Sequence, residues 1–259
     1  MYLPQLMKQV DAGEKLVALT CYDASFARIL VEAGVDILLV GDSLGMTVQG
    51  HDTTLPVGID HMVYHTGAVR RGAPKAFVMS DLSFGSYQVS PSQAFENAAR
   101  LLAAGANMVK LEGGAVMLET VAFLAQRGIP VCGHLGLLPQ SVNQTGYRAQ
   151  ATNSKAAQQL IKDAADLETA GASLLVIESV PALLAAEVSN CLRIPTIGIG
   201  AGGDCDGQVL VLTDLLGITE KPPRFAKNFM TDARGIKDAV ERYVAAVKGG
   251  DFPGPEHGF

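Results

Sequence analysis

The sequence contains few cysteines and no apolar stretch long enough to cross a membrane. Its four cysteines (Cys21, Cys132, Cys191 and Cys205) lie far apart and form no CxxC pair. This spacing does not suit a zinc site, and it favours reduced thiols in a cytosolic protein. No apolar run approaches the ~20 residues that span a bilayer, and the first residues, MYLPQLMKQV, lack the apolar core of a signal peptide. We therefore expect a cytoplasmic protein with no membrane partner.

Charge is also scarce, and positive charge is not concentrated anywhere along the chain. Only 18% of the 259 residues are charged, the formal net charge is −6, and no basic stretch occurs. This balance argues against nucleic acid as a partner. Hydrophobic residues make up 48% of the chain, enough for a large core in a length that α/β barrels use for one domain.

Short apolar runs recur along the chain, with helical periodicity between them, as at 91–106 and 154–172. Alternating strands and helices, with strands apolar on both sides, indicate a parallel sheet covered by helices. Eight such units predict an α/β fold with a closed (β/α)8 TIM barrel, and an open doubly wound sheet is the alternative. We expect a single domain over residues 1–259, with a loose tail from about residue 248. The expected strands are LVALTCYD (16–23), DILLVGD (36–42), AFVMSD (76–81), NMVKLEGG (107–114), IPVCGHLG (129–136), SLLVIESVP (173–181), IPTIGIGAG (194–202) and GQVLVLTD (207–214).

Acidic residues stand where four of these strands end. Asp42, Asp81, Glu112 and Glu178 follow this pattern, and His134 ends the fifth strand. Chemistry in such a barrel collects at the carboxyl ends of the strands. Neighbouring strands lie ~4.8 Å apart, so the first three carboxylates can converge, and an all-oxygen set favours a hard cation, magnesium first. A single Asp after a strand often only caps a turn or helix, but four acids at four strand ends favour a site.

The segment VKLEGG places a cation beside this set. Lys110 and Glu112 are two residues apart, so on an extended strand both point to the same side. Buried charges are costly unless they are paired or coordinate something. Lys110 is therefore a structural counter-ion to Glu112, a binding group for a substrate carboxylate, or a lysine that forms a Schiff base.

One glycine-rich motif is a weaker signal. GIGAGG (198–203) matches a dinucleotide fingerprint in letters only, because a loop and a strand are expected after it where the fingerprint needs a helix.

Several blocks, in this order along nearly the whole chain, resemble one known family. They are VGDSLGM, MSDLSFGSY, VKLEGG, GHLGLLPQSVN, VIESVP and GIGAGGDCDGQVLV. The family is 3-methyl-2-oxobutanoate hydroxymethyltransferase, also called ketopantoate hydroxymethyltransferase. The resemblance implies a (β/α)8 barrel of the phosphoenolpyruvate/pyruvate-binding type. It also implies a transferase that passes the one-carbon unit of 5,10-methylenetetrahydrofolate, as cosubstrate, to 3-methyl-2-oxobutanoate, giving 2-dehydropantoate in pantothenate biosynthesis.

The resemblance also assigns expected roles to matching residues. Asp42 and Asp81 ligate one Mg2+ per subunit, with Glu112 supporting it directly or through water. Through that metal the two aspartates also bind substrate, together with Ser43 and Lys110, which hold the oxoacid. Glu178 is the catalytic base, and His134 is the secondary candidate. The family implies a homo-oligomer, commonly a decamer.

One segment departs from the family pattern, and the function has alternatives. The segment NQTGYRAQATNS (143–154) lacks the second glycine and the Gln–Gly pair that the family usually has. A folate-independent, magnesium-dependent 2-oxoacid aldolase or lyase is the alternative function, because folate pockets carry no short motif. A Schiff-base aldolase using Lys110 and a non-catalytic binding protein on the same barrel are further alternatives.

Overall fold

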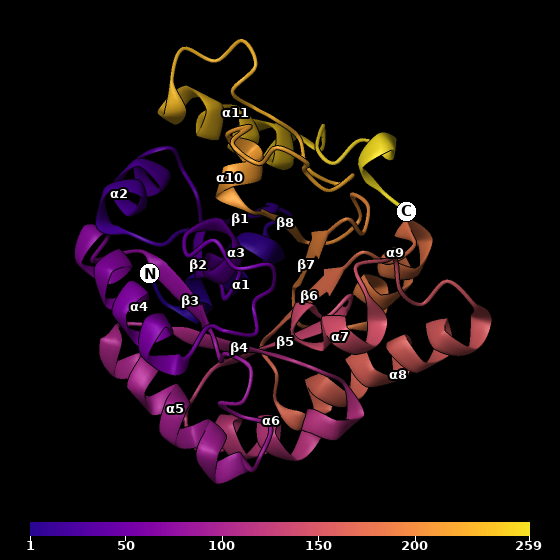
Figure 1. Ribbon diagram of the computed structural model, residues 1–259. Helices are drawn as coiled ribbons and strands as arrows, with labels where there is room; N and C mark the ends of the chain where they lie inside the picture. Colours follow the sequence, from indigo (N-terminus) through magenta and orange to yellow (C-terminus); the bar gives the residue numbers. More distant parts are fainter.

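The computed structural model describes residues 1–259, and its centre is a closed barrel of eight parallel strands in chain order (Figure 1). The predicted (β/α)8 architecture is confirmed, and the open sheet is excluded. Each strand lies within its predicted segment but is shorter. The strands are β1 Leu16–Thr20, β2 Ile37–Val40, β3 Phe77–Asp81, β4 Met108–Glu112, β5 Val131–Gly136, β6 Leu174–Glu178, β7 Thr196–Ile199 and β8 Gly207–Leu210. β3 and β5 run to the last residue of their segments, and the other six end earlier, where the chain turns into the loops above the barrel.

Helices surround the barrel and are bounded by local capping signals (Figure 1). The side chains of Asp23, Ser90 and Asn153 accept backbone N–H groups in the first turns of α2, α5 and α8. Gly105 and Gly171 end α5 and α8 in the left-handed conformation, where glycine carries no side-chain penalty. The α-helices are α1 Leu3–Asp11, α2 Ala24–Glu32, α3 Leu44–Thr47, α4 Ile59–Gly72, α5 Pro91–Ala104, α6 Leu118–Ala125, α7 Val142–Thr145, α8 Ser154–Ala170, α9 Ala182–Cys191, α10 Leu212–Leu215 and α11 Ile236–Gly249, and the 3-10 turns are η1 Ala115–Met117, η2 Pro139–Ser141 and η3 Pro255–His257.

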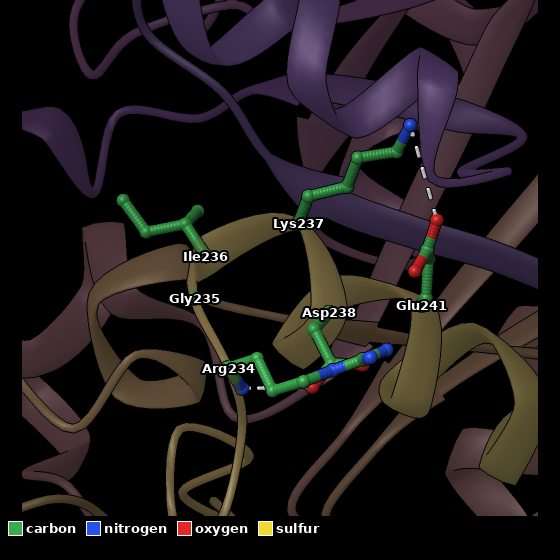
Figure 2. A pocket seen from close by; sticks show the side chains of 6 residues that line it. All are labelled: Arg234, Gly235, Ile236, Lys237, Asp238 and Glu241. Atoms are coloured by element: carbon green, nitrogen blue, oxygen red, sulfur yellow. Dashed lines mark hydrogen bonds and ion pairs between the residues drawn. The ribbon is translucent and has the colours of Figure 1, made fainter.

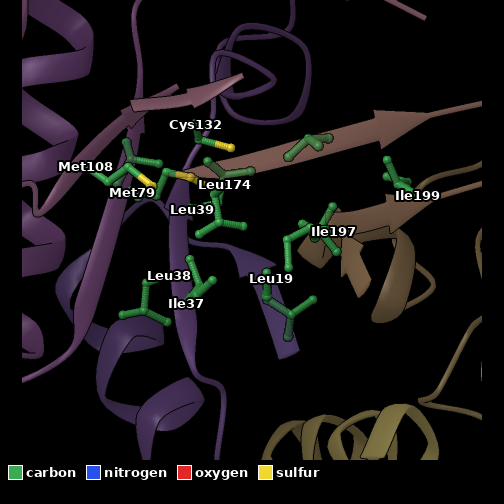
Figure 3. Packing of buried hydrophobic residues seen from close by; sticks show 14 of the residues in the cluster. Leu19, Ile37, Leu38, Leu39, Met79, Met108, Cys132, Leu174, Ile197 and Ile199 are labelled. Atoms are coloured by element: carbon green, nitrogen blue, oxygen red, sulfur yellow. The ribbon is translucent and has the colours of Figure 1, made fainter. Parts of the chain in front are cut away.

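The strands are apolar because the barrel buries them on both sides. Figure 3 shows Leu19, Leu38, Met79, Leu174 and Ile197, from five different strands, within one hydrophobic cluster. All five side chains are fully buried. A polar residue inside such strands has to find a partner or serve a site.

The connection between β7 and β8 departs from the repeating pattern. Only residues 200–206 join these two strands, and they contain no helix, as expected for the GIGAGG segment. Gly200 has a φ of +60°, and a β-carbon there would lie 2.8 Å from the Phe225 ring. Phe225 and the C-terminal Phe259 therefore pack against the short connection, on a side of the barrel that would otherwise be covered by a helix.

The end of the chain is packed, which corrects the expectation of a loose tail from about residue 248. Helix α11 continues to Gly249, and Phe252 beyond it is only 4% exposed. Its ring stacks edge-on against Phe229 and Tyr243 at centroid distances of 5.5 and 5.8 Å. The backbone oxygen of Phe259 accepts the N–H of Ala182 at the start of α9. Gly and Pro in this segment suggest a flexible end, but its aromatic side chains bury apolar surface on the barrel.

None of the helices combines the length and the apolar character needed to cross a membrane.

Candidate active site

Buried charged and polar side chains gather at the carboxyl ends of β2 to β6. Asp42 follows β2, Asp81 ends β3, and Lys110 and Glu112 both belong to β4. These four side chains are nearly inaccessible to solvent. His134 lies in β5, and Glu178 ends β6 with a side chain that is 13% exposed.

Strand register places Lys110 beside an acid. Asp81 and Lys110 are direct partners in the β3–β4 pairing, and Nζ of Lys110 lies 3.1 Å from Oδ1 of Asp81. Burial lowers the pKa of Lys110, but the charges of Asp81, Glu112 and Asp42 outweigh it and raise that pKa above its ordinary value. Lys110 is therefore held as an ammonium ion.

His134 lies between the two glutamates. Glu112 and His134 are partners in the β4–β5 pairing, and Nδ1 of His134 is 3.6 Å from Oε1 of Glu112. Nε2 lies 3.3 Å from Oε2 of Glu178, while Nδ1 is also 3.3 Å from Nζ of Lys110. Burial and Lys110 lower the pKa of His134, but Glu112 and Glu178 together raise it above its ordinary value.

These contacts define what His134 can do. In the neutral ring, Nδ1 accepts from the ammonium of Lys110, so the proton sits on Nε2 and faces Glu178. In the charged ring, Nε2 also carries a proton. In either state Nε2 therefore carries a proton on the side of Glu178, and the 3.3 Å contact between them is a charge contact without hydrogen-bond geometry.

Asp42 and Asp81 lie next to each other. The backbone N–H of Asp42 donates to Oδ2 of Asp81 at 3.1 Å. Burial raises the pKa of Asp42 well above its ordinary value, and the charges of Asp81 and Glu112 raise it further. Burial also raises the pKa of Asp81, although Lys110 acts in the opposite direction. An added cation would stabilise the charged forms of these two buried carboxylates, whose pKa values are raised.

Ser43 precedes the short helix α3 beside this pair. Its Oγ lies 2.9 Å from the phenol oxygen of Tyr22, a residue just after β1. The lack of a side chain at Gly41 leaves room for the Ser43 hydroxyl, because a β-carbon at position 41 would lie 2.9 Å from Oγ of Ser43.

Gln140 and Tyr87 also belong to the site, although no motif in the sequence predicted their roles. Gln140 lies in η2, after β5, and its side-chain Nε2 donates to Oδ2 of Asp42 at 2.8 Å. Its backbone N–H donates to Oε2 of Glu112 at 3.0 Å. The hydroxyl of Tyr87 donates to Oε1 of Gln140 at 2.7 Å. Gln140 stands in the GHLGLLPQSVN block, but a glutamine in a loop carries no chemical signal without its contacts.

The three predicted metal ligands do not form a ready-made metal site. No group of three or more His, Cys, Asp or Glu side chains is gathered closely enough to bind one ion. Asp81 faces Lys110, Asp42 faces Gln140, and Glu112 faces Gln140 and His134. Like charges repel, and each acid has a competing partner within reach.

The donor chemistry nevertheless fits a hard cation. Oδ1 of Asp81 is buried and receives no hydrogen bond, and Lys110 is its charged neighbour. Asp42, Asp81 and Glu112 supply only oxygen atoms, in a cluster with more acids than bases. Such a set suits Mg2+ better than a softer metal.

The backbone around Glu178 is held in an uncommon conformation. Ser179 has a φ of +50°, a region that costs a non-glycine residue about 1–2 kcal/mol. Its N–H donates to the carbonyl of Ile199, and its carbonyl accepts the N–H of Gln150 from the 143–154 segment. The end of β6 is therefore tied to that loop directly after Glu178.

The 143–154 segment carries a second residue of this kind. Ala151 has a φ of +52°, in the stretch where the family usually has a Gln–Gly pair. Nearby, Tyr147 extends toward the mouth of the barrel. Burial raises the pKa of Tyr147, and the charges of Asp42, Glu178 and Glu112 raise it further.

A separate hollow of about 380 Å³ lies at the start of α11. Figure 2 shows its lining by Arg234, Lys237, Asp238 and Glu241, with Lys237 paired to Glu241 and the backbone N–H of Arg234 donating to Asp238. These are surface ion pairs between residues one turn apart, so this hollow is not the active site.

Comparisons with known proteins agree with the geometry. The sequence model of the family "Ketopantoate hydroxymethyltransferase" matches residues 1–255. The chain is 62% identical to a 3-methyl-2-oxobutanoate hydroxymethyltransferase from Nitrosospira multiformis, covering 97% of each chain. It is 60% identical to one from Methylobacillus flagellatus over the full length of both.

Solved structures share the barrel at much lower identity. A phosphonopyruvate hydrolase superposes with a TM-score of 0.64 at 15% identity, covering 84% of each chain. The structure of phosphonopyruvate hydrolase in complex with oxalate and Mg2+ gives 0.62 at 14%, covering 82% of this chain and 81% of the other. At this identity the likeness shows the fold alone. From the family match and the near-full-length relatives, the chain belongs to the ketopantoate hydroxymethyltransferase family.

Proposed function

We propose that this chain transfers the one-carbon unit of 5,10-methylenetetrahydrofolate to 3-methyl-2-oxobutanoate, giving 2-dehydropantoate. The observation that carries the proposal is the buried set of Asp42, Asp81 and Lys110 at the carboxyl end of the barrel. A 2-oxoacid needs a cation for its carboxylate and a polarising group for its keto oxygen. Lys110 supplies the cation for the carboxylate, and the two aspartates fit a metal ion that polarises the keto oxygen.

In this proposal Asp42 and Asp81 hold Mg2+, with Glu112 supporting it directly or through water. When bound, the metal supplies Lewis acidity at the keto oxygen. The protein contributes a dry site, because all three acids are buried, and charge interactions are stronger there than in water.

Ser43 and Lys110 hold the oxoacid in this arrangement. The Tyr22 hydroxyl keeps the Ser43 side chain in place. Lys110, with its raised pKa, stays an ammonium ion and can pair with the substrate carboxylate. The same charge disfavours a Schiff base, because that reaction needs a neutral amine.

Glu178 is the proposed base and takes the proton from C3 of the oxoacid. His134 lies beside it, with Nε2 at 3.3 Å from Oε2 of Glu178. The substrate carbon that loses the proton then bonds to the one-carbon unit, the bonds of that unit to the folate nitrogens break so that tetrahydrofolate leaves, and water supplies the hydroxyl oxygen of the product. His134, as a donor, is less suited to the role of base than the sequence alone suggested.

An assay of the purified chain on 3-methyl-2-oxobutanoate tests the function. We expect 2-dehydropantoate only when methylenetetrahydrofolate and Mg2+ are both supplied. Equal turnover without any folate would instead support the alternative, a magnesium-dependent 2-oxoacid aldolase or lyase.

Asp81→Asn is expected to weaken binding of Mg2+ or its substitute Mn2+ by more than about 100-fold, the upper end of what losing an outer-shell partner costs. The amide loses a charge but can still accept the N–H of Asp42, so the barrel should stay folded. Mn2+ titration followed by electron paramagnetic resonance measures the affinity, and circular dichroism checks the fold. Full activity of this variant at low magnesium would show that Asp81 is not a ligand.

We also propose that the chain self-associates as a homodecamer, on the strength of the family resemblance. The N-terminal helix α1, which covers most of the apolar segment MYLPQLMKQV, is a candidate contact between subunits. Its Leu6 is buried within the subunit, but Tyr2 beside it is 73% exposed and available for such a contact. Static light scattering that gives the mass of one subunit would rule the assembly out.

A further inference from the structure

We propose that Gln140 and Tyr87 act together as positioning residues that hold the carboxylates of Asp42 and Glu112 in the orientation needed to receive a divalent cation. This inference rests on the proposed function. It assigns a role to two residues that contact neither the substrate nor the metal in that proposal.

The amide of the Gln140 side chain uses all of its hydrogen-bonding positions. Nε2 donates to Oδ2 of Asp42 at 2.8 Å and to the carbonyl of Leu82 at 2.9 Å. Oε1 accepts from the Tyr87 hydroxyl at 2.7 Å and from Nε2 of Gln88 at 3.2 Å. Gln140 is 5% exposed. A buried amide with all four positions used has one stable orientation.

The Tyr87 hydroxyl favours one of the two orientations of the Gln140 amide. A flipped amide would aim its oxygen at Asp42 and at the Leu82 carbonyl, so three acceptors would face one another. It would also turn its NH2 group toward the Gln88 amide nitrogen and leave the Tyr87 hydroxyl only the more distant carbonyl of Glu112, at 3.3 Å, as an acceptor. Tyr87 is 1% exposed and its oxygen also accepts the backbone N–H of Glu112 at 3.1 Å. The ring is thus fixed to the end of β4.

Gln140 alone contacts two of the acids, Asp42 and Glu112. The Gln140 side chain holds one oxygen of Asp42, and its backbone N–H holds Oε2 of Glu112 at 3.0 Å. These acids come from the ends of different strands and repel each other when charged. A neutral donor between them fixes one oxygen of each acid and leaves the other oxygen of each for a cation, as outer-shell partners of metal ligands do.

The test uses Gln140→Met, which keeps the chain length and removes every hydrogen bond of the amide, and Tyr87→Phe, which keeps the ring. Gln158→Met on the exposed face of α8 is the matched control. Mn2+ alone is titrated into the substrate-free full-length enzyme and followed by electron paramagnetic resonance. Thermal unfolding is recorded by circular dichroism, and kcat and KM are measured with Mg2+.

We expect Gln140→Met to weaken Mn2+ binding by about 10–100-fold and Tyr87→Phe to weaken it in the same direction, with wild-type affinity in the control. Because Tyr87 acts through the amide, the double variant should be no weaker than Gln140→Met alone. If the two residues contributed only to packing, their substitution would lower the melting temperature and leave the Mn2+ affinity of the folded protein unchanged.

The outcomes separate this inference from the proposed function. Wild-type affinity for Mn2+ in the Tyr87→Phe variant would overturn the positioning role, even where Gln140→Met fails to fold. Additive losses in the double variant would overturn the coupling between the two residues. A wild-type protein that binds no Mn2+ would instead overturn the metal chemistry of the proposed function.

Discussion

Glu178→Gln is expected to lower turnover by about 10²–10⁴-fold, the usual contribution of a positioned base. Glutamine keeps the side-chain length and can occupy the same place beside Nε2 of His134, which lies 3.3 Å from Oε2 in the wild type. What it loses is the carboxylate that takes the C3 proton. Exchange of that proton with deuterated solvent isolates the step, because exchange needs Mg2+ and 3-methyl-2-oxobutanoate but no folate. Nuclear magnetic resonance follows it directly, and we expect exchange to fall by the same factor as turnover.

The matched control for this variant is Glu187→Gln, which changes an exposed glutamate on α9 and should leave exchange at the wild-type rate. Binding of the oxoacid should change little in Glu178→Gln, since Ser43, Lys110 and the metal hold it in the proposed arrangement. If Glu178→Gln exchanged deuterium as fast as the wild type, Glu178 would not be the base. His134 would then be the remaining candidate.

Lys110→Met is expected to destabilise the fold by about 3–5 kcal/mol, the cost of removing one partner from a buried ion pair. Lys110 is the ammonium beside Asp81, at 3.1 Å, and Asp42 and Glu112 contribute to its raised pKa. Without it these buried acids keep no lysine or arginine partner. Urea unfolding at neutral pH measures the loss. The affinity for 3-methyl-2-oxobutanoate should fall as well, because the substrate carboxylate loses its cation.

A second substitution distinguishes this cause from a packing defect. Adding Asp81→Asn to Lys110→Met removes one of the unpaired acids, so the double variant should be more stable than Lys110→Met alone. Lys162→Met, which breaks an exposed pair with Asp166 on α8, serves as the control and should unfold like the wild type. A double variant that is no more stable than Lys110→Met would mean that lost packing, and not unpaired charge, explains the effect.

The altered loop after β5 shows how far sequence reasoning reaches. The missing Gln–Gly pair was visible in the sequence, but its consequence was not. In the structure Ala151 takes a left-handed backbone conformation, and Gln150 binds the carbonyl of Ser179 directly after Glu178. The departure thus affects a segment that supports the end of β6.

The barrel and the chemical character of its mouth were predictable from local sequence patterns. Eight apolar runs with helical periodicity between them are local patterns, and strands buried on both sides leave few alternatives to a covered parallel sheet. Parallel strands share one carboxyl end, so Asp42, Asp81, Glu112 and Glu178 could be placed at that end without knowing their contacts.

The partners of these acids depend on contacts that form only in the folded barrel. Gln140 reaches Asp42 across 98 residues of chain, and His134 meets both glutamates because of strand register and side-chain conformation. The short connection between β7 and β8, and the aromatic tail that packs beside it, likewise depend on contacts distant in sequence. Such contacts form when the barrel closes and leave no local periodicity or spacing in the sequence.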